Sequence, residues 1–453
     1  MSSDNKIKNF LSKELDVNLF INEKIITYML CIVALAFPVL ELICEICGHT
    51  FALQEGILRT AGMMFLVYAV FCVIYKKKHI LVWSDIFFAL SIVFSVISII
   101  FSLDIEVSLG GCYVNMREDP QQVLGYFMIF FMATQVSEYE NRKKIIIAML
   151  IVCAFHTIPS ILQYIDLWPY PPQQAIDETK SYGLTQHYNF YGALAVMFTG
   201  LTTMIFLFKK TIKSYVWYAV ATVCFVASLF AECRLVWVGT ISFFVLVICI
   251  EIYLKKKNKE SLIDIKRLAI IIVTFGVVFG LFMLFASSMR EQLLETYNEV
   301  SGDNLGQLGN NRFHAWYVGL VAVKDHLLTG VGFDNYEMAF FLHPELVRGW
   351  TMFKGHNEYI HTLVTQGLPS AINYIAMCFY VWIFGIKKSV TDKDSNQRAI
   401  YYILLVMVTG YFVQAFFNSS VTNIAPYKWL VMGLLVPRCI QKIIWENKEK
   451  TLS

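Results

Sequence analysis

Long apolar stretches, separated by short polar and basic segments, dominate the pattern of residues along this chain. Twelve of these stretches approach the roughly 20 residues that an α-helix needs to cross a bilayer. They lie near 25–44, 57–75, 82–102, 121–137, 145–165, 189–208, 214–231, 234–254, 268–287, 368–386, 399–418 and 424–443. The pattern predicts an all-α, polytopic membrane protein with about twelve transmembrane helices.

The composition supports this assignment. Hydrophobic residues make up 57% of the 453 residues and charged residues only 16%, which is less charge than a soluble domain uses to cover its surface. The formal net charge of +3 is too small to indicate a nucleic-acid partner. We therefore expect a lipid bilayer to surround most of the chain, and we expect no nucleic acid to bind.

The basic residues fall in alternate connections between the predicted spans. The clusters are KKK at 76–78, RKK at 142–144, lysines at 209–213, KKKNK at 255–259, basic residues at 387–398, and those of both termini. Because cytoplasmic loops carry an excess of Lys and Arg, this side of the membrane should be the cytoplasm. Both termini are then cytoplasmic.

One long connection lies on the opposite, extracytoplasmic side. The predicted organisation is a cytoplasmic segment 1–24, nine spans within 25–287, an extracytoplasmic loop 288–367, three spans within 368–443 and a cytoplasmic tail 444–453. Apolar residues recur at helical spacing from Phe313 to Leu327, which predicts a helix with one apolar face inside the loop. Long loops with structure of their own usually carry function, so this loop is the expected catalytic segment.

Arginines near the outer ends of the spans are candidates for binding an anion. Arg234 lies between two spans with almost no loop, and Arg312 stands at the start of the loop helix. An arginine at the bilayer centre costs about 2.5–3.5 kcal/mol, and less near the interface, so it usually has a partner or a task. The partner of Arg234 is either Glu232 or an anionic ligand. Arg59 and Arg117 admit the same two interpretations.

Histidine and asparagine residues precede two of the predicted spans. His356 and Asn357 lie shortly before the tenth span, and His187 and Asn189 lie at the mouth of the sixth. Asn189 fits equally well as a helix N-cap. His356 and His361 are five positions apart, so they do not form the i,i+4 pair that binds zinc. We predict no metal site and no cofactor.

Together these segments resemble the O-antigen ligase/polymerase superfamily of bacterial envelope glycosyltransferases. The most specific part, 311–370, reads N-R-x-x-x-W, then a helix ending in G-V-G-F, then G-H-N-E-Y-I-H-T-L-V-T-Q-G-L. Weaker matches are G-L-T-Q-H-Y-N-F-Y-G at 183–192 and C-R-L-V-W-V-G at 233–239. Cys233 departs from the pattern, because the family often has a small hydroxylated residue there.

The resemblance implies transfer of a glycan from an undecaprenyl-diphosphate carrier to an acceptor hydroxyl, with inversion and without a metal ion. It implies a multi-pass protein of the bacterial inner (plasma) membrane with its active site on the extracytoplasmic face. The partners would be the carrier-linked glycan donor, a glycan or lipid acceptor, and the bilayer. A ligase uses a lipid core or a protein as acceptor, whereas a polymerase uses another carrier-linked repeat, and the sequence leaves both open.

The candidate residues suit this chemistry. Guanidinium groups bind phosphate oxygens bidentately and stay charged, so Arg234 and Arg312 are candidates for stabilising the departing diphosphate. His356 is a candidate catalytic base for the acceptor hydroxyl or, alternatively, a hydrogen-bond donor to the diphosphate. The candidate substrate-binding residues are Asn357, Arg59, Arg117, His187 and Asn189.

A flippase or transporter of lipid-linked sugars is the alternative function. Such a protein would also be polytopic and basic on its outer side, but it should carry charged residues in mid-span and often shows repeated halves. In this chain the charges gather at the outer ends of spans and in one loop, and no internal repeat is apparent. The sequence therefore favours the enzyme.

Overall fold

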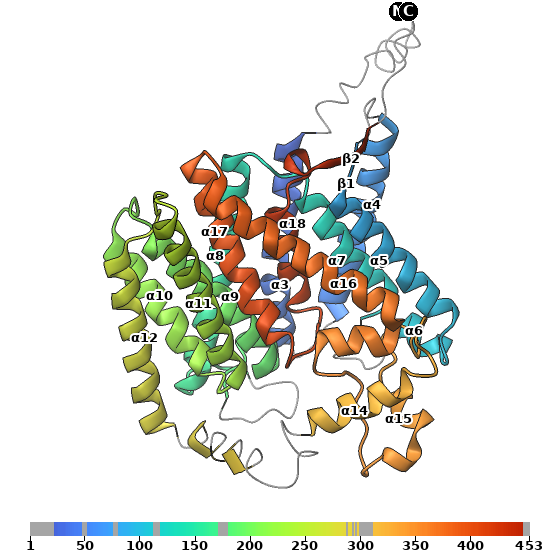
Figure 1. The fold of residues 1–453 in the computed structure, drawn as a ribbon. Helices are drawn as coiled ribbons and strands as arrows, with labels where there is room; N and C mark the ends of the chain where they lie inside the picture. The colour runs from blue at the N-terminus through green and yellow to red at the C-terminus, as the bar shows by residue number, and fades with distance from the viewer. Residues whose placement is uncertain are drawn as a thin grey trace, which may run out of the picture.

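The described part of the chain is a bundle of α-helices with one small two-stranded sheet (Figure 1). The computed structural model describes residues 22–446, except 48–51, 76–79, 112–117, 171–179, 287–288, 292–293, 295–296 and 299–310. Most of the two predicted cytoplasmic ends, and the candidate residue Arg117, lie outside the described residues.

A helix lies in each of the twelve predicted spans. These helices are α3 (Glu23–Cys47), α4 (Ala52–Tyr75), α5 (Trp83–Ile100), α7 (Pro120–Ala133), α8 (Tyr139–Tyr164), α9 (Tyr188–Leu207), α10 (Ser214–Leu229), α11 (Arg234–Lys256), α12 (Ile265–Phe285), α16 (Glu358–Thr391), α17 (Ser395–Gln414) and α18 (Ala425–Leu435). Among the described residues, seven helices are long and apolar enough to cross a membrane, namely α3, α5, α8, α9, α11, α12 and α16. The all-α membrane architecture is thus confirmed, while the number of twelve spans stays a prediction.

Shorter elements lie between these helices and after them. They are β1 (Ile80–Val82), α6 (Ile105–Gly110), α14 (Arg312–Ala322), α15 (Met338–Leu342), the 3-10 helices η2 (Pro344–Leu346) and η3 (Arg438–Ile440), and β2 (Ile443–Glu446). The helix predicted from Phe313 to Leu327 forms as α14, which ends earlier than expected, at Ala322.

Hydrogen bonds bring several basic connections to one face of the bundle. β1 pairs antiparallel with β2, so the connection before α5 lies beside the C-terminal strand. The Glu23 carboxylate accepts from the N–H of Ser137 at 2.9 Å, and Gln397 donates to the carbonyl of Ser137 at 2.9 Å. Arg398 donates to the carbonyl of Glu260 at 3.0 Å. We call this the basic face; it lies at the top of Figure 1, opposite the loop face that carries α14 and α15.

α9 forms the centre of the bundle and is almost wholly buried by its neighbours. Glycines let two of these neighbours approach it closely. A Cβ on Gly239 of α11 would lie 2.8 Å from a methyl of Val196, and a Cβ on Gly410 of α17 would lie 2.5 Å from the same methyl. In lipid, where hydrophobic residues gain little by associating, small residues at the contact allow the tight packing that holds helices together.

α7 and α18 are shorter than a full membrane span. They have 14 and 11 residues, or about 21 and 16 Å at the helical rise, against a hydrocarbon core of about 30 Å. Their C-terminal ends meet near the basic face, where the N–H of Arg438 donates to the carbonyl of Thr134 at 2.7 Å. The two helices therefore stop short of the loop face and leave room between their N-terminal ends and the loop.

The end of the chain differs from the prediction. A span was expected over 424–443, but α18 ends at Leu435 and is followed by η3 and β2. Pro437 explains the early end, because proline lacks an N–H and disfavours helical backbone in the residue before it.

α16 is bent where the loop meets the bundle. Gly367 has φ 80° and ψ 173°, and Pro369 follows it. The helix begins at Glu358, before the predicted start at 368. The kink falls at the predicted end of the loop. The carbonyls of Val364 and Thr365, freed by the kink, accept hydrogen bonds from Val331 at 2.9 Å and Gly332 at 3.2 Å. The kink thus attaches the loop to the bundle.

Replacing Gly367 by alanine should disrupt this attachment. A positive φ with ψ near 180° is adopted almost only by glycine and costs a residue with a side chain about 1–3 kcal/mol, and a Cβ would lie 2.6 Å from the carbonyl carbon of Leu328. We expect Gly367→Ala to lower the midpoint of thermal unfolding and the yield of monodisperse protein in detergent. Gly276→Ala on α12 is the matched control, because its Cβ would meet nothing within 4 Å. Equal unfolding midpoints in the two variants would contradict the role assigned to the kink.

Candidate functional site

The segment Lys354–Glu358 joins the loop to α16 at the loop face and carries three side chains into polar surroundings. Its backbone is unusual, because His356 has a φ of 44°. Asn357 is the N-cap of α16, and its Oδ1 accepts from the N–H groups of Tyr359 and Ile360, both at 3.0 Å. This cap fixes the helix start and, with it, the positions of the residues on either side.

Arg312 opens α14 and lies beside the start of α11. Its Nη1 donates to the carbonyl of Phe417 at 2.7 Å. Burial lowers the pKa of Arg312, and the positive charge of Arg234 acts in the same direction. The two arginines that the sequence singled out are therefore electrostatic neighbours, although 77 other residues separate them in the sequence numbering.

His356 and His187 lie near Arg312. Burial, and then the charge of Arg312, lower the pKa of His356 to about 3. Burial and the same arginine lower the pKa of His187 to about 4. Both imidazoles are therefore neutral at pH 7. We call Arg234, Arg312, His187 and His356 the arginine–histidine cluster.

Asn189 stands next to this cluster, in the first turn of α9. It is not the N-cap of that helix, which was one of its two interpretations. His187 is the N-cap, and its Nδ1 accepts from the N–H of Asn189 at 3.1 Å. The side-chain oxygen of Asn189 instead accepts from the thiol of Cys233 at 3.0 Å. The main-chain carbonyl of Asn189 accepts from the side-chain amide of Asn418 at 3.0 Å.

Two other candidates have different surroundings. Arg59 on α4 forms an ion pair with Asp119, the N-cap of α7, and another with Glu55 at 3.4 Å. The sequence left open whether Arg59 has a protein partner or binds an anionic ligand, and the structure contains the protein partners. Arg117 falls outside the described residues, next to the buried Glu118.

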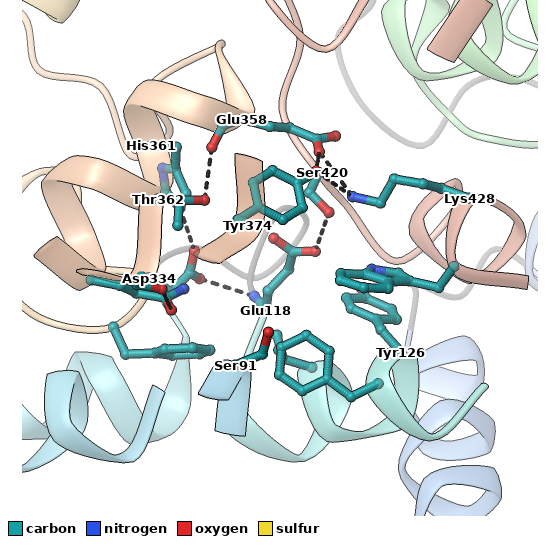
Figure 2. A pocket seen from close by; sticks show the side chains of 16 residues that line it. Ser91, Glu118, Tyr126, Asp334, Glu358, His361, Thr362, Tyr374, Ser420 and Lys428 are labelled. Carbon is teal, nitrogen blue, oxygen red and sulfur yellow. Dashed lines mark hydrogen bonds and ion pairs between the residues drawn. The ribbon is translucent and has the colours of Figure 1, made fainter. Parts of the chain in front are cut away.

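A buried lysine on α18 was not predicted to take part in a site. Lys428 donates to the carboxylate of Glu358 at 2.8 Å (Figure 2). The hydroxyls of Tyr374, at 2.6 Å, and Tyr411 also donate to this carboxylate. Every oxygen of Glu358 is thereby satisfied, so the pair is a fixed part of the wall around it.

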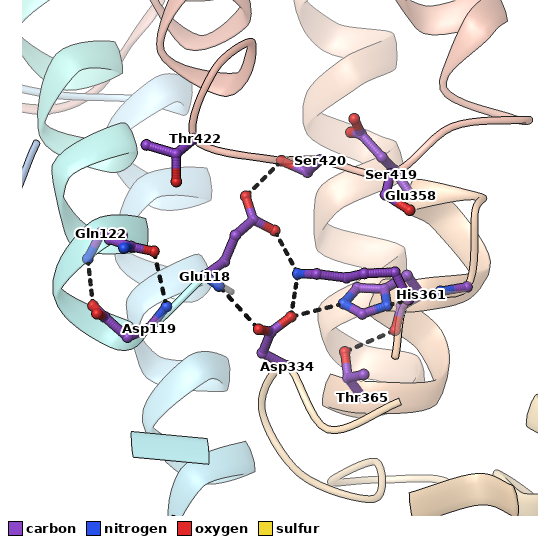
Figure 3. Close-up of polar contacts among 12 residues, drawn as sticks. Glu118, Asp119, Gln122, Asp334, Glu358, His361, Thr365, Ser419, Ser420 and Thr422 are labelled. Atoms are coloured by element: carbon purple, nitrogen blue, oxygen red, sulfur yellow. Dashed lines mark hydrogen bonds and ion pairs between the residues drawn. The ribbon is translucent and has the colours of Figure 1, made fainter. Parts of the chain in front are cut away.

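A second ionic group, also unpredicted, links the loop to α7. Lys354 donates to Glu118 at 3.1 Å and to Asp334, and the N–H of Glu118 donates to Asp334 at 2.9 Å (Figure 3). His361 approaches Asp334 at 3.4 Å. Burial alone would raise the pKa of Asp334, but the charge of Lys354 and the hydrogen bond and charge of His361 together outweigh burial and lower that pKa to about 2. We call Glu118, Asp334, Lys354 and His361 the acidic network.

A cavity of about 80 Å³ lies between the acidic network and the Glu358–Lys428 pair (Figure 2). Its ionisable lining residues are Glu118, Asp334, Glu358, His361 and Lys428. Hydroxyl and amide groups from Thr362, Gln366, Ser370 and Ser420 line it as well, as do the rings of Tyr126, Phe127 and Trp429. It occupies the room that the short helices α7 and α18 leave below the loop face.

The chemistry of this region is that of two adjoining sites. The arginine–histidine cluster offers positive charge and neutral imidazoles, which suit a phosphate-bearing group. The cavity offers carboxylates, hydroxyls and aromatic rings. Among the described residues, no group of three or more His, Cys, Asp or Glu side chains is arranged to hold a metal ion.

Comparison with known families supports the interpretation of the motifs. Residues 219–375 match the family model described as O-antigen ligase. The predicted resemblance to the O-antigen ligase/polymerase superfamily is thus confirmed over this segment, which contains Arg234, Arg312 and His356. No curated protein gives a significant match to the chain.

The lowered pKa of His356 predicts a dependence of stability on pH. The unfolded chain binds a proton at this histidine near its ordinary pKa of 6.5, whereas the folded protein resists protonation down to about 3. Stability should therefore fall as the pH decreases through this window. His356→Asn cannot titrate and tolerates positive φ, so it should flatten the pH profile of the unfolding midpoint between about 7 and 4.

The matched control for this measurement is His343→Asn, a partly exposed histidine of the same loop. It should leave the pH profile parallel to that of the wild type. If His356→Asn gives the wild-type profile as well, then His356 is protonated in the folded protein at the same pH as in the unfolded chain, and the assignment of a neutral imidazole is wrong.

Proposed function

We propose that this membrane protein of the O-antigen ligase type transfers a glycan from an undecaprenyl-diphosphate carrier to an acceptor hydroxyl, with inversion and without a metal ion. The observation that carries the proposal is the position of Arg312, which lies near both Arg234 and His356 although the three come from distant parts of the family-matched segment. Its setting is the bacterial inner membrane, with the site on the extracytoplasmic side. The loop 288–367 is the catalytic segment.

The arginines act on the leaving group. As the bond between the sugar and the diphosphate breaks, negative charge grows on the diphosphate oxygen. Arg234 and Arg312 are held in place before the reaction, so they stabilise this charge without further reorganisation. The first N–H groups of α14, which begins at Arg312, are unpaired within the helix and point in the direction that favours an anion.

His356 acts on the acceptor. The acceptor oxygen attacks the anomeric carbon from the side opposite the diphosphate, the glycosidic C–O bond breaks, and the hydroxyl proton passes to the imidazole. A neutral imidazole is the form that can accept this proton. A pKa of about 3 makes it a weak base in the free protein, but a diphosphate bound nearby raises the pKa of an adjacent histidine. Binding of the donor thus activates the base.

The remaining candidates play supporting parts. His187 completes the cluster and is a proposed contact of the donor, while Asn357 places His356 through the cap of α16. Asn189 orders the cluster through its bonds to Cys233 and Asn418. Arg59 stands beside the N-terminus of α7. We propose Arg59 and Arg117, which lies outside the described residues, as contacts for the outer part of a substrate.

Exchanging Arg312 for lysine separates charge from geometry. Lysine keeps the positive charge but replaces a planar, five-donor group by a point charge. If Arg312 grips the diphosphate as the bond breaks, Arg312→Lys should lower kcat by about ten- to a hundredfold and change the KM for the donor little. The assay measures the transfer rate against carrier-linked donor in proteoliposomes, and gel analysis of the product distinguishes a lengthened carrier-linked chain from a glycan joined to another acceptor.

Arg348→Lys serves as the control, because Arg348 is an exposed arginine of the same loop. This variant should transfer at the wild-type rate. Should Arg312→Lys do the same, Arg312 serves only to attract anionic lipid. A wild-type protein that moves the lipid-linked glycan across the bilayer without forming a new glycosidic bond would refute the transferase and establish the transporter.

A further inference from the structure

The cavity adjoins the arginine–histidine cluster but has the opposite electrical character. The cavity residue His361 lies close enough to His356 for its charge to lower the pKa of His356. The segment Lys354–Glu358 connects the cluster and the cavity. His356 belongs to the cluster, whereas Lys354 forms an ion pair with the cavity residue Glu118 and Glu358 forms one with the cavity residue Lys428. A substrate that reacts at His356 therefore has the cavity within its reach.

The charges around the cavity disfavour an anion. Three carboxylates line it, from Glu118, Asp334 and Glu358. Two ammonium groups balance part of this charge: that of Lys428, which also lines the cavity, and that of Lys354, which pairs with Glu118 and Asp334. A phosphate or an acidic sugar would add a further negative charge to this buried set, at a high desolvation cost. The diphosphate belongs in the arginine–histidine cluster, and the cavity suits a neutral group.

The polar and aromatic lining suits a carbohydrate. Carboxylate oxygens accept hydrogen bonds from sugar hydroxyls, and Ser370, Thr362 and Gln366 stand along one side of the cavity at helical intervals on α16. The indole of Trp429 and the ring of Tyr126 supply flat apolar surfaces from the two short helices. Sugars present both kinds of surface, with hydroxyls at the ring edge and C–H groups on its faces.

The size of the cavity selects the end of a chain. Its volume of about 80 Å³ has room for roughly six water molecules at ~10–15 Å³ each, which is the scale of one sugar ring. A donor sugar is bonded to the diphosphate on one side and to the rest of the glycan on the other, so its site must be open at both ends. The acceptor sugar is the terminus of a chain, so a recess with room for a single ring can hold it.

Building on the proposed function, we propose that this cavity binds the terminal sugar of the acceptor, and that this sugar is uncharged. The walls then present the acceptor hydroxyl toward His356 while the diphosphate stays on the arginines. The recess above α7 and α18 is the structural origin of this acceptor subsite. Acceptors that end in an acidic sugar should be poor substrates.

Ser370→Leu tests the proposal by filling the cavity with an apolar side chain while leaving every ion pair in place. It should raise the KM for the acceptor by about tenfold or more and leave the KM for the donor within about twofold. The control is Ser242→Leu on α11, the same change at a half-buried site away from the cavity. A raised donor KM with an unchanged acceptor KM would instead assign the cavity to the donor sugar and overturn the proposal.

A binding measurement tests the cavity independently of transfer. Saturation-transfer NMR on the full-length protein in lipid nanodiscs should detect methyl β-glucoside, with methyl β-glucuronide at least about tenfold weaker. Ser370→Leu should lose the glucoside signal, and Ser242→Leu should keep it. Equal binding by wild type and Ser370→Leu would refute the acceptor subsite. If the wild type binds the glucoside but transfers no glycan, the proposed function fails and the sugar-binding cavity stands.

Glu118→Gln provides a second variant in case Ser370→Leu unfolds the protein. It removes one carboxylate from the cavity and keeps its shape, so the preference for the glucoside over the glucuronide should shrink by several fold. Glu140→Gln, an exposed glutamate at the start of α8, is the matched control and should leave the preference unchanged. An unchanged preference in Glu118→Gln would show that the acidic walls do not select the ligand.

Discussion

The break in α16 at Gly367 is the constraint on which the arrangement of the loop face depends. A helix that passes through a kink leaves carbonyls without partners, and in a membrane protein each of them must be satisfied by protein. Here the loop supplies the partners, through the N–H groups of Val331 and Gly332, and Ser98 of α5 adds a bond of 2.8 Å to Thr365. Gly332 stands two residues before Asp334, so the same bonds that close the kink also position the acidic network.

Lys354 is the point at which the loop, α7 and α16 are joined. A lysine that is 1% exposed is costly unless its charge is compensated, and it is compensated by Glu118 and Asp334 together. Truncating either acidic side chain would weaken an attachment that also holds the neighbouring Gly355 and His356. The ionic groups around the cavity therefore hold the segment Lys354–Glu358 in place, and this is independent of any contact that they make with substrate.

The sequence predicted what depends on local pattern. Runs of apolar residues located all twelve helices, and arginines at the ends of spans, together with the motif around His356, located the arginine–histidine cluster. The acidic network escaped prediction because Glu118, Asp334 and Lys354 come from distant segments, and a single sequence does not show which charges pair. The Glu358–Lys428 pair did leave a signal in the sequence. Lys428 interrupts an apolar run, and a charged residue in such a place usually has a buried partner. The early start of α16 was hidden by polar residues, although Asn357 is a typical N-cap.

The backbone gives independent support for treating the loop face as a prepared site. Residues other than glycine rarely adopt positive φ, and each such residue costs of order 1–3 kcal/mol, which the surrounding structure must offset. Five of those in the described residues are Gln186, Glu232, Asn311, Asp334 and His356. Each of the five is a residue of the two adjoining sites or lies within two positions of one. Strained backbone of this kind is found more often at functional sites than elsewhere in proteins. Here the strained residues come from separate segments of the chain and lie in or next to the two adjoining sites. The other described non-glycine residues with positive φ are Asp166, Lys213 and Asn258, so this conformation is concentrated around the two adjoining sites but is not confined to them.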